Sequence, residues 1–265
     1  MKKLSALFIL FALGLLTYSQ SAKDKMPITT NSKTALAFYN EAMKCFEDVD
    51  LTKGGDLLLK SLTEDPGFFM ANYQMSLYCS WIGNLEKSNF YTGAAINCKT
   101  KLSQAEELLR GALIKLKEKN DADVAEVGKK LVEMYPRDVN SYNNLFYFQS
   151  IINDTIGELE TLNEGLKIAE NPAPFYNQLG YVYMILKQND KAEVAFNKYI
   201  ELDPKNPNVY DSKGDFFMNL KDYKKAYESY MKAYSLDTAW GLKKAQTAKQ
   251  LYENKEGKKL EIIPL

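Results

Sequence analysis

Hydrophobic and polar positions recur along this chain with a period of 34 residues. Ala173–Asn206 aligns with Pro207–Trp240 without a gap, and large and small residues repeat at the same places. The matched pairs are Tyr176 with Tyr210, Gly180 with Gly214, Ala192 with Ala226, Phe196 with Tyr230, and Leu202 with Leu236. About 34 residues is the length of two helices of three to four turns joined by short turns. The period therefore predicts an all-α solenoid of stacked helix pairs, without strands.

The same register continues, more weakly, through the rest of the chain. It predicts six units: Ala35–Phe68, Phe69–Leu102, Ala105–Asp138, Val139–Pro172, Ala173–Asn206 and Pro207–Trp240. Ser103 and Gln104 form a two-residue insertion, since Pro66 and Pro136 lie 70 rather than 68 residues apart. Leu242–Tyr252 predicts a capping helix that is lysine-rich on its outer side and can therefore face water. We expect a solenoid over 35–252 and a tail over 253–265 that is either loose or folded back along the last helix.

Small residues occupy the position where the two helices of a pair are expected to cross closely. That position holds Ala42, Ser76, Ala112, Phe146, Gly180 and Gly214, which are small in every unit but one. Large residues such as Tyr176 and Phe196 lie on either side of it. Pro66, Pro136 and Pro204 close their units because proline cannot continue a helix. Each pair buries only one face by itself, so its stability must come from stacking on its neighbours.

These residues resemble the tetratricopeptide repeat, whose pattern is an opening aromatic, Leu-Gly, a second aromatic, small residues in the second helix and a closing Pro. Ala173–Asn206 shows the pattern with Tyr176, Leu179, Gly180, Tyr183, Ala192, Phe196 and Pro204. Pro207–Trp240 departs from it at Lys213, where Leu is expected, and at Thr238, where Pro is expected. The likeness is weakest in the two middle units, in which Phe146 and Glu158 take small-residue positions. It covers roughly residues 35–240 and implies a right-handed superhelix.

In that family the first helix of each unit lines a concave groove, and its outward residues contact ligands. Carried over to the last three units, the resemblance implies nine contact residues: Asn143, Asn144, Tyr147, Asn177, Gln178, Tyr181, Asp211, Ser212 and Asp215. Side-chain amides can donate to and accept from a peptide backbone, and tyrosine offers a rigid apolar face. The set contains no Lys or Arg to clamp a carboxylate or phosphate, so we expect a neutral or backbone-read ligand. Ordinary solvated helix residues are the alternative interpretation.

The N-terminus is typical of an export signal. Lys2 and Lys3 precede an apolar run over Leu4–Leu16, and small residues suitable for cleavage follow. The run is well short of the roughly 20 residues that span a bilayer, although a short membrane anchor is the alternative. We expect a signal peptide over 1–21, a polar linker or frayed terminus over 22–34, and a mature protein that is periplasmic or secreted and has no membrane span.

Composition narrows the classes of function. The formal charge is zero, with 34 basic and 34 acidic residues, which argues against a dedicated nucleic-acid binder. Histidine is absent, so the commonest general base and metal ligand are missing. No phosphate-binding loop or nucleophile motif is present. Asp121 and Asp123 could touch a cation, but a helix-capping role is favoured. The sequence therefore predicts no catalytic residue, no metal site and no cofactor.

Three cysteines and two threonines are candidates for covalent chemistry. Cys45, Cys79 and Cys98 are predicted to be buried thiols, since 34-residue spacing puts the first two on successive helices too far apart for a disulfide. Thr155 and Thr238 follow Asp in a pattern that resembles bacterial O-glycosylation acceptors. Helix capping is favoured for them, with Thr155 and Glu158 as a capping box.

Three functions from different classes follow from these observations. The favoured hypothesis is a non-enzymatic scaffold of the bacterial cell envelope that holds a protein or peptide partner in the concave groove. The second is a periplasmic accessory that binds or handles carbohydrate, because Trp81, tyrosines and amides also suit sugars. The third is an enzyme, which would need a catalytic centre without histidine or a recognisable motif. The partner's identity and any self-association are left open.

Overall fold

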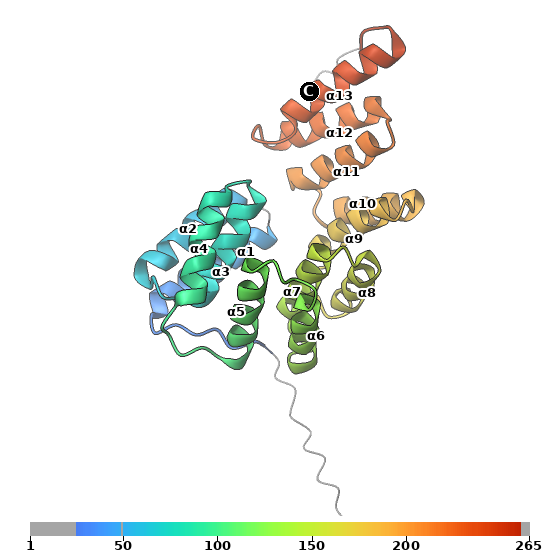
Figure 1. The fold of residues 1–265 in the computed structure, drawn as a ribbon. Helices are drawn as coiled ribbons and strands as arrows, with labels where there is room; N and C mark the ends of the chain where they lie inside the picture. Colours follow the sequence, from blue (N-terminus) through green and yellow to red (C-terminus); the bar gives the residue numbers. More distant parts are fainter. Residues whose placement is uncertain (1–24, 49, 261–265) are drawn as a thin grey trace, which may run out of the picture.

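The computed structural model describes residues 25–48 and 50–260, and within them the chain forms thirteen α-helices and no strand (Figure 1). The helices are α1 (Lys33–Glu47), α2 (Leu51–Glu64), α3 (Phe69–Trp81), α4 (Leu85–Asn97), α5 (Gln104–Lys117), α6 (Val124–Met134), α7 (Val139–Ile151), α8 (Thr155–Leu166), α9 (Ala173–Ile185), α10 (Asn189–Leu202), α11 (Pro207–Asn219), α12 (Tyr223–Leu236) and α13 (Leu242–Glu256). The predicted all-α repeat solenoid is confirmed. The expected signal peptide lies outside the described residues.

The first helix of each unit ends in the same hydrogen-bonded turn. In the last unit the Asp222 amide donates to the Phe217 carbonyl at 3.0 Å, across a residue, Lys221, with φ of 58°. This is the six-to-one bond of a Schellman-type helix end. The equivalent donor–acceptor pairs are Asp50–Cys45, Asn84–Cys79, Asn120–Lys115, Asp154–Gln149 and Gln188–Tyr183. Their acceptors are 34 residues apart except for one step of 36, from Cys79 to Lys115, which is the predicted insertion.

A glycine and an aromatic ring close the helix pairs of the last two units. A Cβ on Gly180 would lie 2.5 Å from Cε1 of Phe196, so the ring fills the space that the absent side chain leaves between α9 and α10. Gly214 meets the ring of Tyr230 in the same way. The predicted pairing of small and large residues thus sets how closely the two helices approach.

The third unit packs differently from the last two. Gly128 lies 68 residues, or two repeats, before Phe196, so this unit has no aromatic ring at the equivalent position. A Cβ on Gly128 would lie 2.6 Å from Cα of Leu145, so α6 packs closely on α7 instead of α5. Across the inner face, Tyr73 of α3 donates to Asn144 of α7 at 2.7 Å, with both residues buried. Helices α3 and α7 therefore meet directly, and the solenoid curls sharply at α5.

The curl brings two arms of the molecule together. Figure 1 shows α1–α4 on one side and α8–α13 on the other, joined through α5–α7. The arms touch where the Asn206 side-chain amide, before α11, donates to the Asp48 carbonyl at the end of α1, at 3.3 Å. The concave face between the arms is thus enclosed by helices that are far apart in sequence.

An N-terminal strap, residues 25–32, packs against the start of α5 and the residue before α7. It has the non-helical backbone expected of a linker, but it is packed rather than frayed. The Met26 amide donates to Asp138 at 2.7 Å, and Thr29 donates through its amide and hydroxyl to the Glu106 carboxylate at 2.8 and 2.6 Å. Met26 is buried. The strap thereby ties the first turn of α5 to the start of α7.

The C-terminal helix α13 packs on α12 as a cap, one turn longer than predicted. Its C-terminus is closed by Gly257 in the left-handed region. Leu260 is buried beside α12 and α13, and its amide donates to Glu253 at 3.1 Å. The described part of the tail therefore lies back along the last helix, which was one of the two expectations. Within the described residues, no helix has the length and apolar character needed to cross a bilayer.

Three local expectations need correction. The cap of α8 is Asp154, whose carboxylate accepts from the Gly157 amide at 3.0 Å, so the predicted Thr155 capping box was wrong. Asp123 stands at the N-cap of α6 but accepts no capping hydrogen bond, because its carboxylate pairs with Lys115 at 3.5 Å. Cys45 and Cys79 are buried free thiols, whereas Cys98 at the end of α4 is only half-buried.

Candidate ligand-binding groove

Two adjoining pockets hollow the concave face. The central pocket, about 990 Å³, lies between α1 and α3 on one side and α7 and α9 on the other. The end pocket, about 750 Å³, is formed by α9, α11 and the start of α13. Trp81, at the end of α3, lines both pockets and marks their boundary. Helix α5 contributes to neither, because the direct contact of α3 with α7 leaves it outside the concave face.

All nine residues predicted to contact a ligand line these pockets. The central pocket has Asn143, Asn144, Tyr147 and Gln178, and the end pocket has Asn177, Tyr181, Asp211, Ser212 and Asp215. They come from α7, α9 and α11, which each present one side to the pockets. Whether they contact a ligand stays a prediction.

Three of the nine are committed to contacts inside the protein. Asn144 accepts from Tyr73 and donates to the Asn140 carbonyl at 2.7 Å, so both ends of its amide are used. Asp211 and Ser212 are buried, at 6% and 1% exposure. Asn143 is exposed and the other five are half-buried. The side chains that remain accessible to a ligand are therefore fewer than the helical pattern suggested.

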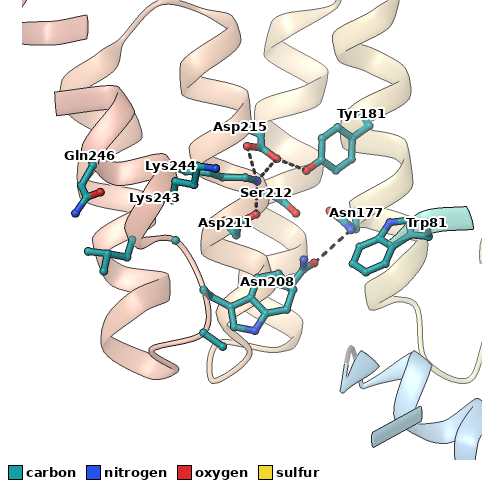
Figure 2. Close-up of a pocket in the computed structure, with 14 residues that line it drawn as sticks. Trp81, Asn177, Tyr181, Asn208, Asp211, Ser212, Asp215, Lys243, Lys244 and Gln246 are labelled. Atoms are coloured by element: carbon teal, nitrogen blue, oxygen red, sulfur yellow. Dashed lines mark hydrogen bonds and ion pairs between the residues drawn. The ribbon is translucent and has the colours of Figure 1, made fainter. Parts of the chain in front are cut away.

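A network of charges and hydroxyls forms the floor of the end pocket (Figure 2). The Lys244 ammonium of α13 lies 2.6 Å from Asp211 and 2.9 Å from Asp215. Asp215 also accepts hydrogen bonds from the hydroxyls of Tyr181 at 2.9 Å and Tyr230 at 2.7 Å. One carboxylate thus joins α9, α11, α12 and α13, which fixes the floor before any ligand arrives.

Burial and these partners shift the protonation equilibria of the network. Burial raises the pKa of Asp211, and the hydrogen bond and charge of Lys244 oppose that shift. The pKa of Lys244 is raised, since its two carboxylate partners outweigh its burial. Burial and the Asp215 carboxylate raise the pKa of Tyr181 and Tyr230. At neutral pH both tyrosines therefore keep the protons that they donate to Asp215.

The nine predicted residues include no Lys or Arg, but the pockets are also lined by basic residues. Lys243 and Lys244 line the end pocket, and Lys25 and Arg137 line the central one. These cations come from the capping helix, the strap and a loop, which the first-helix rule, that the first helix of each unit lines the groove, does not cover. Each pocket holds two basic and two acidic residues, with Glu47 and Glu170 in the central pocket and Asp211 and Asp215 in the end pocket. The expectation of a neutral or backbone-read ligand stays a prediction.

Two acceptor atoms on consecutive residues of α9 have no hydrogen-bond partner although they are buried. They are Oδ1 of Asn177, in the end pocket, and Oε1 of Gln178, in the central pocket. A buried acceptor without a donor costs about 1–3 kcal/mol. A ligand that passes over α9 with N–H or O–H groups would recover that cost at both atoms.

The sequence missed the opposite wall of the central pocket. Met43 and Phe46 of α1 and Leu77 of α3 give this wall an apolar surface that faces the amides of α7 and α9. The same first-helix rule applies to the inner positions of the first two units. The sequence could therefore have identified these residues as part of the pocket lining. That they face α7 and α9 depends on the curl at α5, for which the sequence signal is Gly128 in place of an aromatic residue.

In the part of the chain that the structure describes, no group of three or more Cys, Asp or Glu residues is placed to hold a metal ion. The perturbed groups of the end pocket are paired with each other rather than arranged as a nucleophile with a base. The fold defines the class of the protein, an all-α helical-repeat solenoid.

Comparison with known proteins gives the family. Residues 173–206 and 207–239 match models of the tetratricopeptide repeat, with the unit boundaries that the 34-residue period predicts. These two units of the chain are tetratricopeptide repeats, and such repeats suggest an interaction scaffold for other proteins. Proteins of this family are generally non-enzymatic.

Individual relatives share parts of this architecture. Anaphase-promoting complex subunit 3 of Schizosaccharomyces pombe is 36% identical over 73 residues, which are 28% of this chain and 11% of that protein. A tetratricopeptide repeat protein from Parabacteroides merdae has a similar fold, with TM-score 0.52 and 13% identity over 84% of this chain and 85% of its own. A thermophilic TPR protein of Thermus thermophilus gives TM-score 0.49 and 16% identity over 82% of this chain and 98% of its own.

Proposed function

We propose that the chain is a non-enzymatic scaffold that holds an extended segment of a partner protein in its concave groove. The observation that carries this proposal is the central pocket, where an apolar wall from α1 and α3 faces amides from α7 and α9. An extended peptide presents side chains to one side and backbone N–H and C=O groups to the other. The pocket offers apolar contact for the first and hydrogen bonds for the second.

The free amide groups favour recognition of the partner's backbone. Asn143 is exposed in the pocket, and Gln178 has a buried Oε1 atom without a donor. A backbone N–H of the segment would donate to this oxygen. Phe46 and Leu77 would then receive its apolar side chains. The equal numbers of acidic and basic lining residues favour a segment with little net charge.

We infer that the scaffold works in the bacterial cell envelope, as a periplasmic or secreted protein. This rests on the basic start, the apolar run and the small residues of 1–21. Fusing 1–24 to a reporter that is active only outside the cytoplasm tests it. An active, cleaved reporter supports export, and an inactive one contradicts it.

Affinity capture with paired variants tests the scaffold function. The wild-type chain, the double variant Asn143→Ala/Gln178→Ala and a convex control, Glu160→Ala/Asn163→Ala on α8, would be immobilised after circular dichroism shows equal helicity. We expect a protein of the native envelope extract to be retained stoichiometrically by the wild type and the control, but not by the groove variant. Equal retention by all three would place the interaction outside the groove.

A further inference from the structure

Both tryptophans of the chain line the end pocket. Trp81 reaches it from the end of α3, on the N-terminal arm, and Trp240 from the loop before α13. Trp81 is 66% exposed, so most of its indole surface is free for a ligand, and Figure 2 places it beside Asn177. Indole is a large, rigid, flat apolar surface. Two of them at one pocket, brought from opposite arms, suit a ligand with flat apolar faces.

The polar atoms around the indoles require a ligand that both donates and accepts hydrogen bonds. The unpartnered Oδ1 atom of Asn177 needs a donor. Lys243 and Gln246 are exposed donors on α13 at the same pocket. Asp215 already accepts four hydrogen bonds, from Tyr181, Tyr230 and twice from Lys244, so the acceptor left for a ligand is the Asn177 oxygen. A hydroxyl group meets all of these needs because it donates one hydrogen bond and accepts two.

The charges argue against an anionic or cationic ligand. Asp211 and Asp215 would repel a carboxylate or phosphate, and the one cation placed between them, Lys244, is already paired with both. A cationic side chain would have to displace Lys244, which also lies 5.5 Å from the centre of the Tyr230 ring. The paired network therefore leaves a rigid, polar and nearly neutral floor.

We propose that the end pocket binds a neutral oligosaccharide. Each pyranose ring has an apolar face of C–H groups that lies flat on an indole, and a rim of hydroxyls that meets the Asn177 and Gln246 amides and the Lys243 ammonium. A pocket of about 750 Å³ is within the usual range for small ligands and has room for more than one sugar unit. This inference goes beyond the proposed scaffold function and does not depend on it, since the peptide proposal is carried by the central pocket.

Tryptophan fluorescence tests the inference directly, because the chain has no tryptophan outside this pocket. The full chain would be titrated with short neutral glucans, xylans, mannans and chitin oligosaccharides, with calorimetry in parallel. We expect at least one of them to shift the emission to shorter wavelength as an indole leaves water. Trp240→Ala should weaken that binding by about tenfold or more.

Two matched variants test whether sugar binding is specific to the end pocket. Phe90→Ala removes an aromatic side chain on α4, away from both pockets and as exposed as Trp81, and should leave sugar binding unchanged. Asn143→Ala/Gln178→Ala alters only the central pocket and should also bind sugar normally. The inference is overturned if no oligosaccharide binds, or if binding survives Trp240→Ala. It is also overturned if a pool of random peptides shifts the emission and no oligosaccharide does, which would assign the pocket to peptide.

Discussion

Lys213 shows how a residue that departs from the repeat pattern can still fit its position. It stands where the family has Leu, and its side chain is 8% exposed. The stem fills the leucine position, while the ammonium pairs with Glu193 at 3.0 Å and lies 4.8 and 4.9 Å from the ring centres of Phe216 and Phe217. The sequence identified the departure but could not name Glu193 as the partner, which lies on the preceding second helix.

Restoring leucine at this position should stabilise the protein. Replacing a buried ion pair by an apolar side chain of similar volume is neutral or stabilising, so Lys213→Leu is expected to raise the free energy of unfolding by about 1 kcal/mol, because the Glu193 carboxylate that it leaves unpaired is 48% exposed and stays hydrated. Glu193→Gln leaves the buried ammonium without its counter-charge and should lower that free energy by about 1–3 kcal/mol. Urea denaturation followed by circular dichroism measures both. A loss of stability in Lys213→Leu would contradict this interpretation of the ion pair.

The advantage of Lys213→Leu should shrink as pH rises. Burial lowers the pKa of Lys213, and Glu193 opposes the shift without cancelling it. Between that lowered pKa and the unfolded value of about 10.4, the unfolded chain binds more protons, so the wild type gains stability with rising pH. The variant lacks this gain. Denaturation of both proteins at neutral and alkaline pH checks the sign, and a constant difference would show that the pKa is not lowered.

At the scale of elements, the spacing of small and large residues determines which helices pair. The sequence correctly places Gly180 against Phe196 and Gly214 against Tyr230, because both members of each contact recur in register. In the third unit Gly128 occupies the position of the aromatic residue, so no aromatic ring is present there. The pairing of two helices could thus be predicted where a large residue of one helix packs on a small residue of the other. It could not be predicted for α6, which packs closely on α7.

Two glycines in helices should respond oppositely to alanine. Gly180→Ala forces a methyl group into the Phe196 ring and should lower the free energy of unfolding by about 1–3 kcal/mol. Gly93→Ala, in α4, meets no atom within 4 Å and should raise it by about 0.5–1 kcal/mol through helix propensity. Thermal or urea unfolding distinguishes them. Equal effects would mean that Gly180 is not a packing residue.

The N-terminal strap should contribute to stability through one carboxylate. Glu106 is 1% exposed and accepts from both donors of Thr29 and from the Ser103 amide at 2.8 Å. Glu106→Gln puts an N–H donor where a carboxylate oxygen accepted these hydrogen bonds. The substitution should therefore lower the free energy of unfolding by about 2–3 kcal/mol. The neighbouring Glu107 pairs with Arg110 at the surface, so Glu107→Gln should change stability by less than about 0.5 kcal/mol. Proteolysis within 25–32 should accelerate only in the first variant, and an unaltered strap there would contradict this role.

At the scale of the whole molecule, the sequence predicts which residues lie on the concave face. It does not predict that the two arms approach each other across that face. The nine groove residues were placed on the concave face because first helices repeat in register. The approach of the two arms depends on Tyr73 reaching Asn144 and on Asn206 reaching Asp48, contacts between residues far apart in the chain. No periodic pattern encodes such contacts. Trp81 therefore lines the end pocket only because the arms approach each other.

Site-specific photo-crosslinking in native envelope extract tests the scaffold function most directly. A photoreactive amino acid would be placed at Gln178, on the concave face, or at Asn163, on the convex side of α8. We predict that a single partner protein is crosslinked from Gln178 and not from Asn163, and that an excess of unlabelled chain competes for it. Crosslinking of that partner from Asn163 alone would contradict a scaffold that works through its concave groove.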